Sequence, residues 1–122
     1  MVREYVLRLQ AIRFRANLGA SSSERAIPQE IVVDVELTLP VSALPEHDNK
    51  RDVVDYNAVS NLVVEEGLAK PWRLLETYAA RLVEQLLEKT PALRVKISAT
   101  KLRVPTTHSV DKAIVELVGT RG

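Results

Sequence analysis

The clearest candidate for binding chemistry in this 122-residue chain is a carboxylate that stands among apolar residues. Glu76 directly follows Leu74 and Leu75 at the predicted start of a helix, where the helix dipole favours a negative charge. A carboxylate in this place can accept two parallel hydrogen bonds from an amidine-like pair of N–H groups on a heterocyclic ring. An ordinary acidic residue in the first turn of a helix has the same pattern, so Glu76 by itself identifies no ligand.

A second candidate is Lys101, which ends a predicted strand shortly before a turn that contains Pro105. A lysine beside a pocket can carry a proton during catalysis, although an ordinary strand-end lysine fits the same pattern. Glu24 lies in the predicted loop between the first two strands, and Tyr56 stands where a loop enters a helix. Both are also common surface or packing residues. Taken singly, these residues predict no more than a polar pocket.

Several kinds of chemistry are excluded or disfavoured by what the sequence lacks. The chain has no cysteine, which excludes disulfides, cysteine nucleophiles and thiolate-bound metals. His47 and His108 stand alone, without the spacing of a metal-binding cluster, so we expect no metal site. The sequence contains neither a glycine-rich phosphate loop nor a Gly-x-Ser-x-Gly nucleophile elbow.

Length and charge indicate one small domain that covers residues 1–122. The 17 basic and 16 acidic residues are interspersed and give a formal charge of +1, which argues for neither a nucleic-acid nor a membrane partner. The N-terminus lacks the apolar stretch of a signal peptide, and no apolar run approaches the roughly 20 residues of a membrane span. We therefore expect a soluble cytoplasmic protein.

Alternating apolar residues predict four strands. The apolar phase of the first strand slips by one residue between Leu9 and Ile12, which is what a bulge produces. The second strand has the cleanest alternation and ends at Pro40, and a turn at 104–107 precedes the last strand. The predicted strands cover residues 4–16, 31–39, 93–101 and about 110–118.

Two helices are predicted between the second and third strands. Asp55 can cap a helix that begins near Tyr56 and ends around Gly67, before Pro71. The second helix runs from about Leu74 to Lys89, and its apolar residues recur at the spacing of a buried stripe. That stripe consists of Leu75, Ala79, Leu82 and Leu86.

The order ββααββ predicts an α+β fold, with a four-stranded antiparallel sheet and both helices on one of its faces. The other face is mixed in polarity, and the two outer strands leave open edges that invite pairing with another chain. We therefore expect an oligomer that forms through the edges of the sheet.

Four segments, taken together, resemble the dihydroneopterin aldolase family. They occur in the order and with the spacings typical of that family across residues 4–118, and the ordered set is more specific than any one motif. The segments are Leu18-Gly19-Ala20-Ser21-Ser22-Ser23-Glu24-Arg25 with Gln29 and Val33-Asp34-Val35, then Asp52-Val53-Val54-Asp55-Tyr56, Leu74-Leu75-Glu76-Thr77, and Thr100-Lys101.

The resemblance implies the tunnelling fold, in which four subunits join their sheets into a barrel-like ring and two rings commonly stack. We therefore expect a homo-oligomer, either a tetramer or an octamer, with active sites between subunits. By the same resemblance, Tyr56 matches a tyrosine supplied by the adjacent subunit. Val54 and Ala20 match positions that line the pocket through their backbones.

The remaining site residues also follow from the resemblance. Glu76 matches the anchor that holds the 2-amino and N3 groups of a pterin ring, and the Leu75 backbone would add a hydrogen bond. Lys101 matches a lysine implicated in proton transfer, and Glu24 matches a carboxylate near that lysine and the substrate hydroxyls. The implied reaction is the retro-aldol cleavage of 7,8-dihydroneopterin on the path to folate, which requires no cofactor.

Some residues depart from the family pattern. Asn17-Leu18 replaces the histidine or aromatic residue common before the glycine, and Leu102-Arg103-Val104 separates Lys101 from the following proline. The usual Gly-Val-Gly-Val of the last strand is absent as well. In two of these features the chain resembles a sister group, the dihydroneopterin triphosphate epimerases, instead. The alternatives are therefore an epimerase and a non-catalytic pterin-binding oligomer. In an epimerase, the triphosphate could be bound by Arg13, Arg15 and Arg103.

Overall fold

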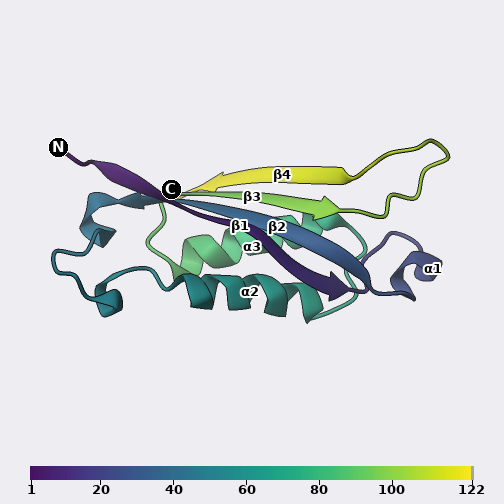
Figure 1. Cartoon of the computed structure of the whole chain (residues 1–122), viewed down its shortest axis with the longest axis horizontal. Helices are drawn as coiled ribbons and strands as arrows, with labels where there is room; N and C mark the ends of the chain where they lie inside the picture. Colours follow the sequence, from purple (N-terminus) through teal and green to yellow (C-terminus); the bar gives the residue numbers. More distant parts are fainter. Residues whose placement is uncertain (122) are drawn as a thin grey trace.

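The computed structural model describes residues 1–121 and contains a four-stranded antiparallel sheet with two long helices on one face (Figure 1). The strands are β1 (Glu4–Ala16), β2 (Gln29–Pro40), β3 (Arg94–Lys101) and β4 (Ala113–Thr120). The helices are α1 (Ser22–Arg25), α2 (Tyr56–Leu68) and α3 (Leu75–Lys89). The predicted α+β arrangement is confirmed. Within residues 1–121, no helix is long and apolar enough to cross a membrane.

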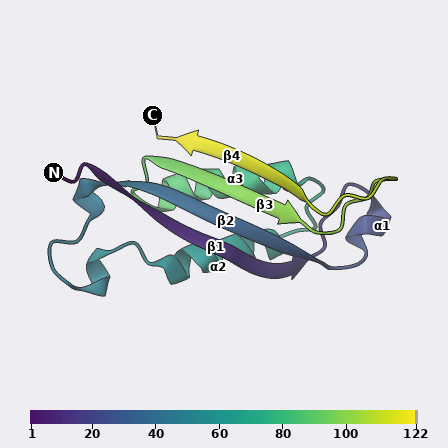
Figure 2. The ribbon, with the colours of Figure 1, turned by 45° about the horizontal axis from the view of Figure 1, so that its top comes forward.

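The order of the strands across the sheet is β1-β2-β3-β4, the same as their order along the chain (Figure 2). All three neighbouring pairs are antiparallel. The last strand begins at Ala113 rather than at residue 110, because Ala113 lies opposite Lys101, where β3 ends. Residues ahead of Ala113 therefore have no strand to pair with.

The short helices were not predicted. The one-turn helix α1 lies between β1 and β2, and two 3-10 helices lie between β2 and α2. A single turn contains too few residues for apolar periodicity to reveal it. These 3-10 helices are Val41–Ala43 and Lys50–Asp52.

The predicted bulge in β1 is confirmed. The pairing of β1 with β2 shifts between Leu9 and Ile12, and Ala11 between them has a positive φ of 61°. The Ala11 N–H donates a hydrogen bond of 2.6 Å to Asp34 Oδ1 on β2. The extra residue thus restores the apolar phase of β1, so that Phe14 also lies over the core.

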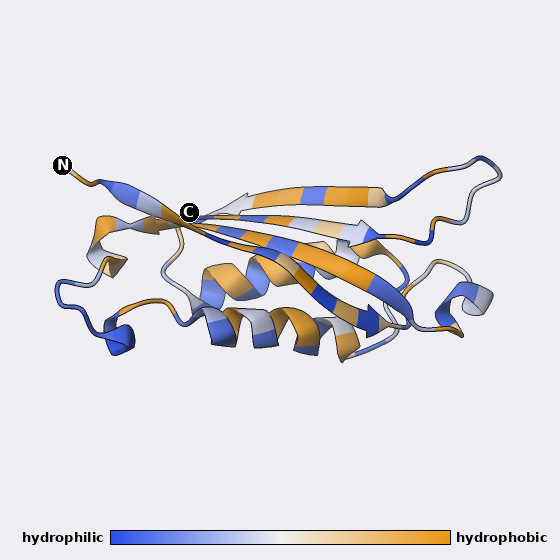
Figure 3. Ribbon diagram, viewed as in Figure 1, coloured by the Kyte–Doolittle hydropathy of each residue, from blue (hydrophilic) through white to orange (hydrophobic). Residues whose placement is uncertain are grey.

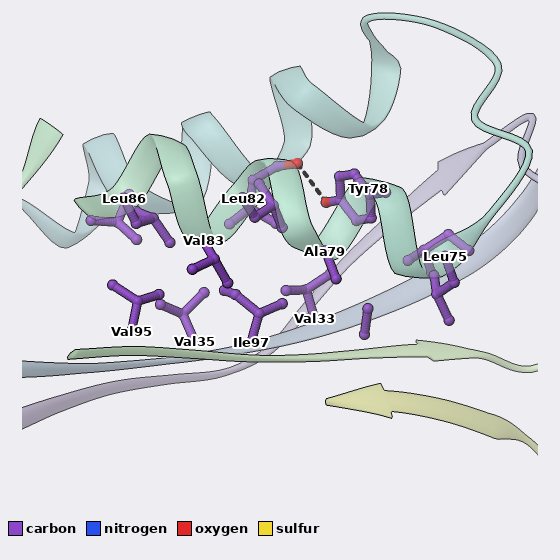
Figure 4. Packing of buried hydrophobic residues seen from close by; sticks show 14 of the residues in the cluster. Val33, Val35, Leu75, Tyr78, Ala79, Leu82, Val83, Leu86, Val95 and Ile97 are labelled. Carbon is purple, nitrogen blue, oxygen red and sulfur yellow. Dashed lines mark hydrogen bonds between the residues drawn. The ribbon is translucent and has the colours of Figure 1, made fainter. Parts of the chain in front are cut away.

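The core lies between the sheet and the helices. The colouring of Figure 3 alternates along β2, and the helix-facing apolar residues of this strand are at most 2% exposed. The stripe predicted on α3 is buried as expected and packs on Val33, Val35, Val95 and Ile97 of the sheet (Figure 4). The buried apolar residues of β2 are Ile31, Val33, Val35, Leu37 and Leu39.

Tyr78 joins the two long helices within this core. Its side chain is fully buried, and its hydroxyl donates to the carbonyl oxygen of Val63 on α2 at 2.8 Å (Figure 4). Burial raises the pKa of Tyr78, and the charge of Glu66 raises it further. The phenol therefore remains a neutral hydrogen-bond donor, which keeps α3 in register with α2.

The bulge yields a prediction about stability. Ala11→Gly should raise the free energy of unfolding by roughly 0.5–1 kcal/mol, because a left-handed backbone strains alanine but not glycine. Ala80→Gly, at an exposed position of α3, is the matched control and should lower it by about 1 kcal/mol. Urea unfolding of both variants measures the two effects. A clear loss of stability in Ala11→Gly would contradict a strained residue at position 11.

Candidate active site

Lys101 and Glu24 form a buried ion pair at one end of the sheet. Lys101 is the last residue of β3, and Glu24 belongs to α1, which lies beyond the ends of β1 and β3 (Figure 1). The Lys101 Nζ donates to Glu24 Oε2 at 2.6 Å, and the side chains are 14% and 8% exposed, respectively. The fold thus brings together two predicted site residues from distant parts of the chain.

The loop that precedes Glu24 is built around its carboxylate. The backbone N–H of Ala20 donates to Glu24 Oε1 at 3.0 Å, so both carboxylate oxygens have a donor. Ser21 caps α1, and its Oγ accepts a hydrogen bond from the Glu24 N–H at 3.2 Å. Gly19 lies directly behind the side chain, where an added Cβ would stand 2.4 Å from the Cγ and Cδ of Glu24. A glycine is therefore required at this point for the carboxylate to fit.

Opposing effects act on the pKa of the Glu24 carboxyl group. Burial acts to raise this pKa, because it disfavours the ionised form. The hydrogen bond and charge of Lys101, with the Ala20 amide and the Gln29 side chain, more than offset burial and hold the pKa below its ordinary value of 4.5. Glu24 is therefore ionised at neutral pH and able to hold Lys101 in place.

Gln29 is a site residue to which sequence reasoning assigned no role. It is only 4% exposed, and its Nε2 donates to the carbonyl oxygen of Leu18 at 2.5 Å. Its Oε1 is buried without a hydrogen-bond partner among residues 1–121. A signal was present in the sequence, because Gln29 is in phase with Ile31 and Val33 on the buried side of β2. A polar residue in that phase needs a polar partner.

Glu76 and Leu75 lie at the same end of the molecule as the buried ion pair. Glu76 is exposed in the first turn of α3, whereas the Leu75 side chain is 6% exposed and belongs to the core. The N–H of Gly19 donates to the carbonyl oxygen of Trp72 at 3.0 Å. This bond ties the loop 19–24 to the segment that leads into α3.

Tyr56 and Val54 lie at the other end of the molecule. Tyr56 begins α2 and is 63% exposed, and Val54 precedes it in the loop. The 13 residues of α2 span about 20 Å, and Figure 1 shows the short helix α1 beyond the last turn of α2, on the side away from its start. Within one chain, the structure therefore does not bring Tyr56 or Val54 to the buried ion pair.

The fold and this site together define a class of protein. It is an α+β protein with a lysine–carboxylate pair suited to proton transfer and a second carboxylate, at a helix start, suited to ligand binding. The family model of the FolB dihydroneopterin aldolases matches residues 7–118. The chain therefore belongs to the dihydroneopterin aldolase family.

Individual relatives agree with this assignment. Dihydroneopterin aldolase 1 of Arabidopsis thaliana is 33% identical over 93 residues, which are 74% of this chain and 64% of the plant protein. The dihydroneopterin aldolase of Streptomyces coelicolor is 26% identical over 113 residues, which cover 93% of this chain and 95% of that relative.

Two solved structures share the fold. The dihydroneopterin aldolase of E. coli, in complex with neopterin, superposes with a TM-score of 0.83 at 20% identity. The superposition covers 97% of this chain and 99% of the E. coli chain. The dihydroneopterin aldolase of Burkholderia thailandensis, bound to guanine, has a TM-score of 0.82 at 24% identity. This superposition covers 98% of this chain and 93% of the Burkholderia chain. At these identities, the likeness establishes the architecture.

The buried ion pair predicts a loss of stability in acid. The Glu24 carboxyl is ionised in both the folded and the unfolded chain well above its ordinary pKa of 4.5, so the stabilisation is complete there. It should decline as the pH falls below 4.5 through the lower folded pKa. Unfolding of the wild type and of Glu24→Gln across this range, at constant protein concentration, should give a difference that shrinks in acid. A difference independent of pH would contradict an ionised pair.

Proposed function

We propose that this chain cleaves 7,8-dihydroneopterin into 6-hydroxymethyl-7,8-dihydropterin and glycolaldehyde, a step of folate biosynthesis. The observation that carries the proposal is the buried ion pair of Lys101 and Glu24, at 2.6 Å, in a chain of this family. The names of the Arabidopsis and Streptomyces relatives support it. The two similar structures hold neopterin and guanine. Both ligands are heterocycles with the pair of N–H groups that Glu76 is proposed to bind.

The reaction is a retro-aldol cleavage and amounts mainly to the movement of protons. A base removes the proton of the second side-chain hydroxyl, the bond between the first and second side-chain carbons breaks, and glycolaldehyde leaves with the new C=O. The electrons of the broken bond pass into the ring C=N and give an enamine. An acid then protonates the enamine carbon and gives the hydroxymethyl group. Because the ring itself accepts the electrons, no Schiff base, metal or cofactor is required.

The proposed roles divide between binding and proton transfer. Glu76 accepts two parallel hydrogen bonds from the 2-amino and N3 groups of the pterin. Lys101, with a water molecule, and Tyr56 act as the proton donors and acceptors. Glu24 holds Lys101 and accepts hydrogen bonds from the substrate hydroxyls. The backbones of Leu75, Val54 and Ala20 complete the lining of the pocket.

We further propose that each site is shared between two copies of the chain. Tyr56 and Val54 lie an α2 length away from the buried ion pair, so a neighbouring copy has to supply them. The outer strands β1 and β4 have unpaired backbone edges, and exposed apolar residues lie beside them, including Val6, Ile114 and Val118. Pairing of these edges would join the sheets into a barrel, in a tetramer or an octamer.

The proposed activity predicts stoichiometric products. The purified protein, incubated with 7,8-dihydroneopterin, should release equal amounts of glycolaldehyde and 6-hydroxymethyl-7,8-dihydropterin. Glu76→Ala should weaken pterin binding by roughly tenfold or more, because hydrogen bonds to a charged group are lost. The control is Glu88→Ala, at an exposed position near the end of α3, which should bind normally. Conversion of the triphosphate without cleavage would instead indicate an epimerase, and pterin binding without conversion would indicate a binding protein.

The shared site predicts complementation between inactive variants. Lys101→Ala and Tyr56→Phe should each lower turnover strongly when assayed alone. Mixed oligomers should recover about a quarter of the wild-type activity. A site is intact only when its Lys101 comes from the Tyr56→Phe chain and its Tyr56 from the Lys101→Ala chain, which random mixing gives in about one site of four. Light scattering would establish the mass of the oligomers, and native mass spectrometry would establish that the two variants are mixed within them. Confirmed mixed oligomers without recovered activity would contradict a site shared between copies.

A further inference from the structure

We propose that Arg25 is a positioning residue for Glu24, because it holds the peptide group whose N–H fixes the Glu24 carboxylate. The effect on catalysis rests on the proposed function, whereas the effect on the carboxylate itself does not. The guanidinium Nη1 of Arg25 donates to the carbonyl oxygen of Gly19 at 3.0 Å and to that of Ala20 at 2.9 Å. Both acceptors are main-chain carbonyls in the loop that surrounds the carboxylate.

The planarity of the peptide bond turns these contacts into a constraint. The Gly19 carbonyl and the Ala20 N–H belong to one peptide group, which is trans and planar, so they point in opposite directions. With the carbonyl directed at Arg25, the N–H is directed at Glu24 Oε1, 3.0 Å away. Two residues that are neighbours in the sequence thus hold the same peptide group from its two sides.

The charge of Arg25 adds to this geometric effect. A cationic donor on the carbonyl polarises the peptide group and makes its N–H a stronger hydrogen-bond donor. That N–H bonds the ionised form of Glu24, and so contributes to the lowered pKa of the carboxyl group. Loss of Arg25 should therefore raise the pKa of Glu24 and loosen its hold on Lys101.

The rest of the loop is anchored independently of the Arg25 side chain. Asn17 Nδ2 donates to the backbone carbonyl of Arg25 at 2.7 Å, and the Gly19 N–H donates to Trp72. These bonds persist when the guanidinium is removed. Substitution of Arg25 should therefore free the Gly19–Ala20 peptide to rotate without displacing the whole loop.

The first test is kinetic. Arg25→Met should lower kcat for 7,8-dihydroneopterin by about tenfold or more, the usual effect of losing a hydrogen bond to a charged group. KM should change much less, because the proposed pterin anchor lies on α3. The acidic limb of the pH–rate profile should move to higher pH. Arg25→Lys should restore part of kcat, since an ammonium group can also donate to the two carbonyls.

Arg81→Met is the matched control, because the ion pairs of Arg81 within residues 1–121 join it to Glu66 and Glu84 on the helices, away from the loop 19–24. It should leave kcat and the pH–rate profile unchanged. An unchanged kcat in Arg25→Met, or an equal loss in Arg81→Met, would overturn the proposal. Thermal melting of Arg25→Met and Arg25→Lys separates a loss of folding from a loss of positioning.

A double-mutant cycle tests whether Arg25 acts through Glu24. In the Glu24→Gln background, Arg25→Met should cause little further loss of kcat, because the carboxylate that Arg25 positions is already gone. A further loss as large as in the wild type would overturn the proposal. It would mean that Arg25 acts on the reaction by another route.

A measurement without substrate separates this proposal from the proposed function. Carbon NMR of labelled glutamate side chains, with the Glu24 signal assigned from Glu24→Gln, follows the titration of the carboxyl group. Glu24 should titrate at a higher pH in Arg25→Met than in the wild type or in Arg81→Met. If the wild type fails to cleave dihydroneopterin, the proposed function fails, but this shift still decides the role of Arg25. Identical titrations would overturn that role.

Discussion

The buried ion pair of Lys101 and Glu24 is the constraint on which this end of the molecule depends. Removing two charges from water costs several kcal/mol per ion, and only good geometry with satisfied hydrogen bonds offsets that cost. One Glu24 oxygen is bonded by Lys101 and the other by the N–H of Ala20. The loop before Glu24 must therefore adopt one conformation, which explains the glycine at position 19 and the carbonyl contacts of Arg25.

The length of α2 has a further consequence for the site. A rigid helix of 13 residues keeps Tyr56 away from the buried ion pair, so under the proposed function a second copy would have to supply that hydroxyl. The helix-free face of the sheet is an unsuitable place to join copies. Its ion pairs cross between strands, as in Arg8 with Glu36 at 2.7 Å, and stacking would desolvate them. The edges of β1 and β4 carry no such penalty and leave backbone groups to be paired.

Much of the fold could be predicted because apolar periodicity reports directly on burial. The α3 stripe and the slip in β1 each followed from the spacing of apolar residues, and the structure contains both. The helix α1 could not be predicted, since a one-turn helix depends on its cap and its tertiary contacts. The proximity of Glu24 to Lys101 was predicted only from a family resemblance, because no local pattern in the sequence links residues 77 positions apart. A role for Gln29 was not predicted, because one polar residue in a buried phase also fits the ordinary start of a strand.

The proposed site divides ligand binding and proton transfer between different elements. The Glu76 carboxylate stands exposed at the start of α3, where it needs only a helix end and a ligand with matching N–H groups. Lys101, proposed for proton transfer, belongs to β3, and Glu24, proposed to hold it, belongs to α1, and the two are joined by a hydrogen bond between residues 77 positions apart. Under the proposed function, binding would therefore depend on a rigid helix built into the core, whereas proton transfer would depend on a loop whose backbone must not rotate. Changes in the loop should consequently alter turnover while recognition of the ring is retained.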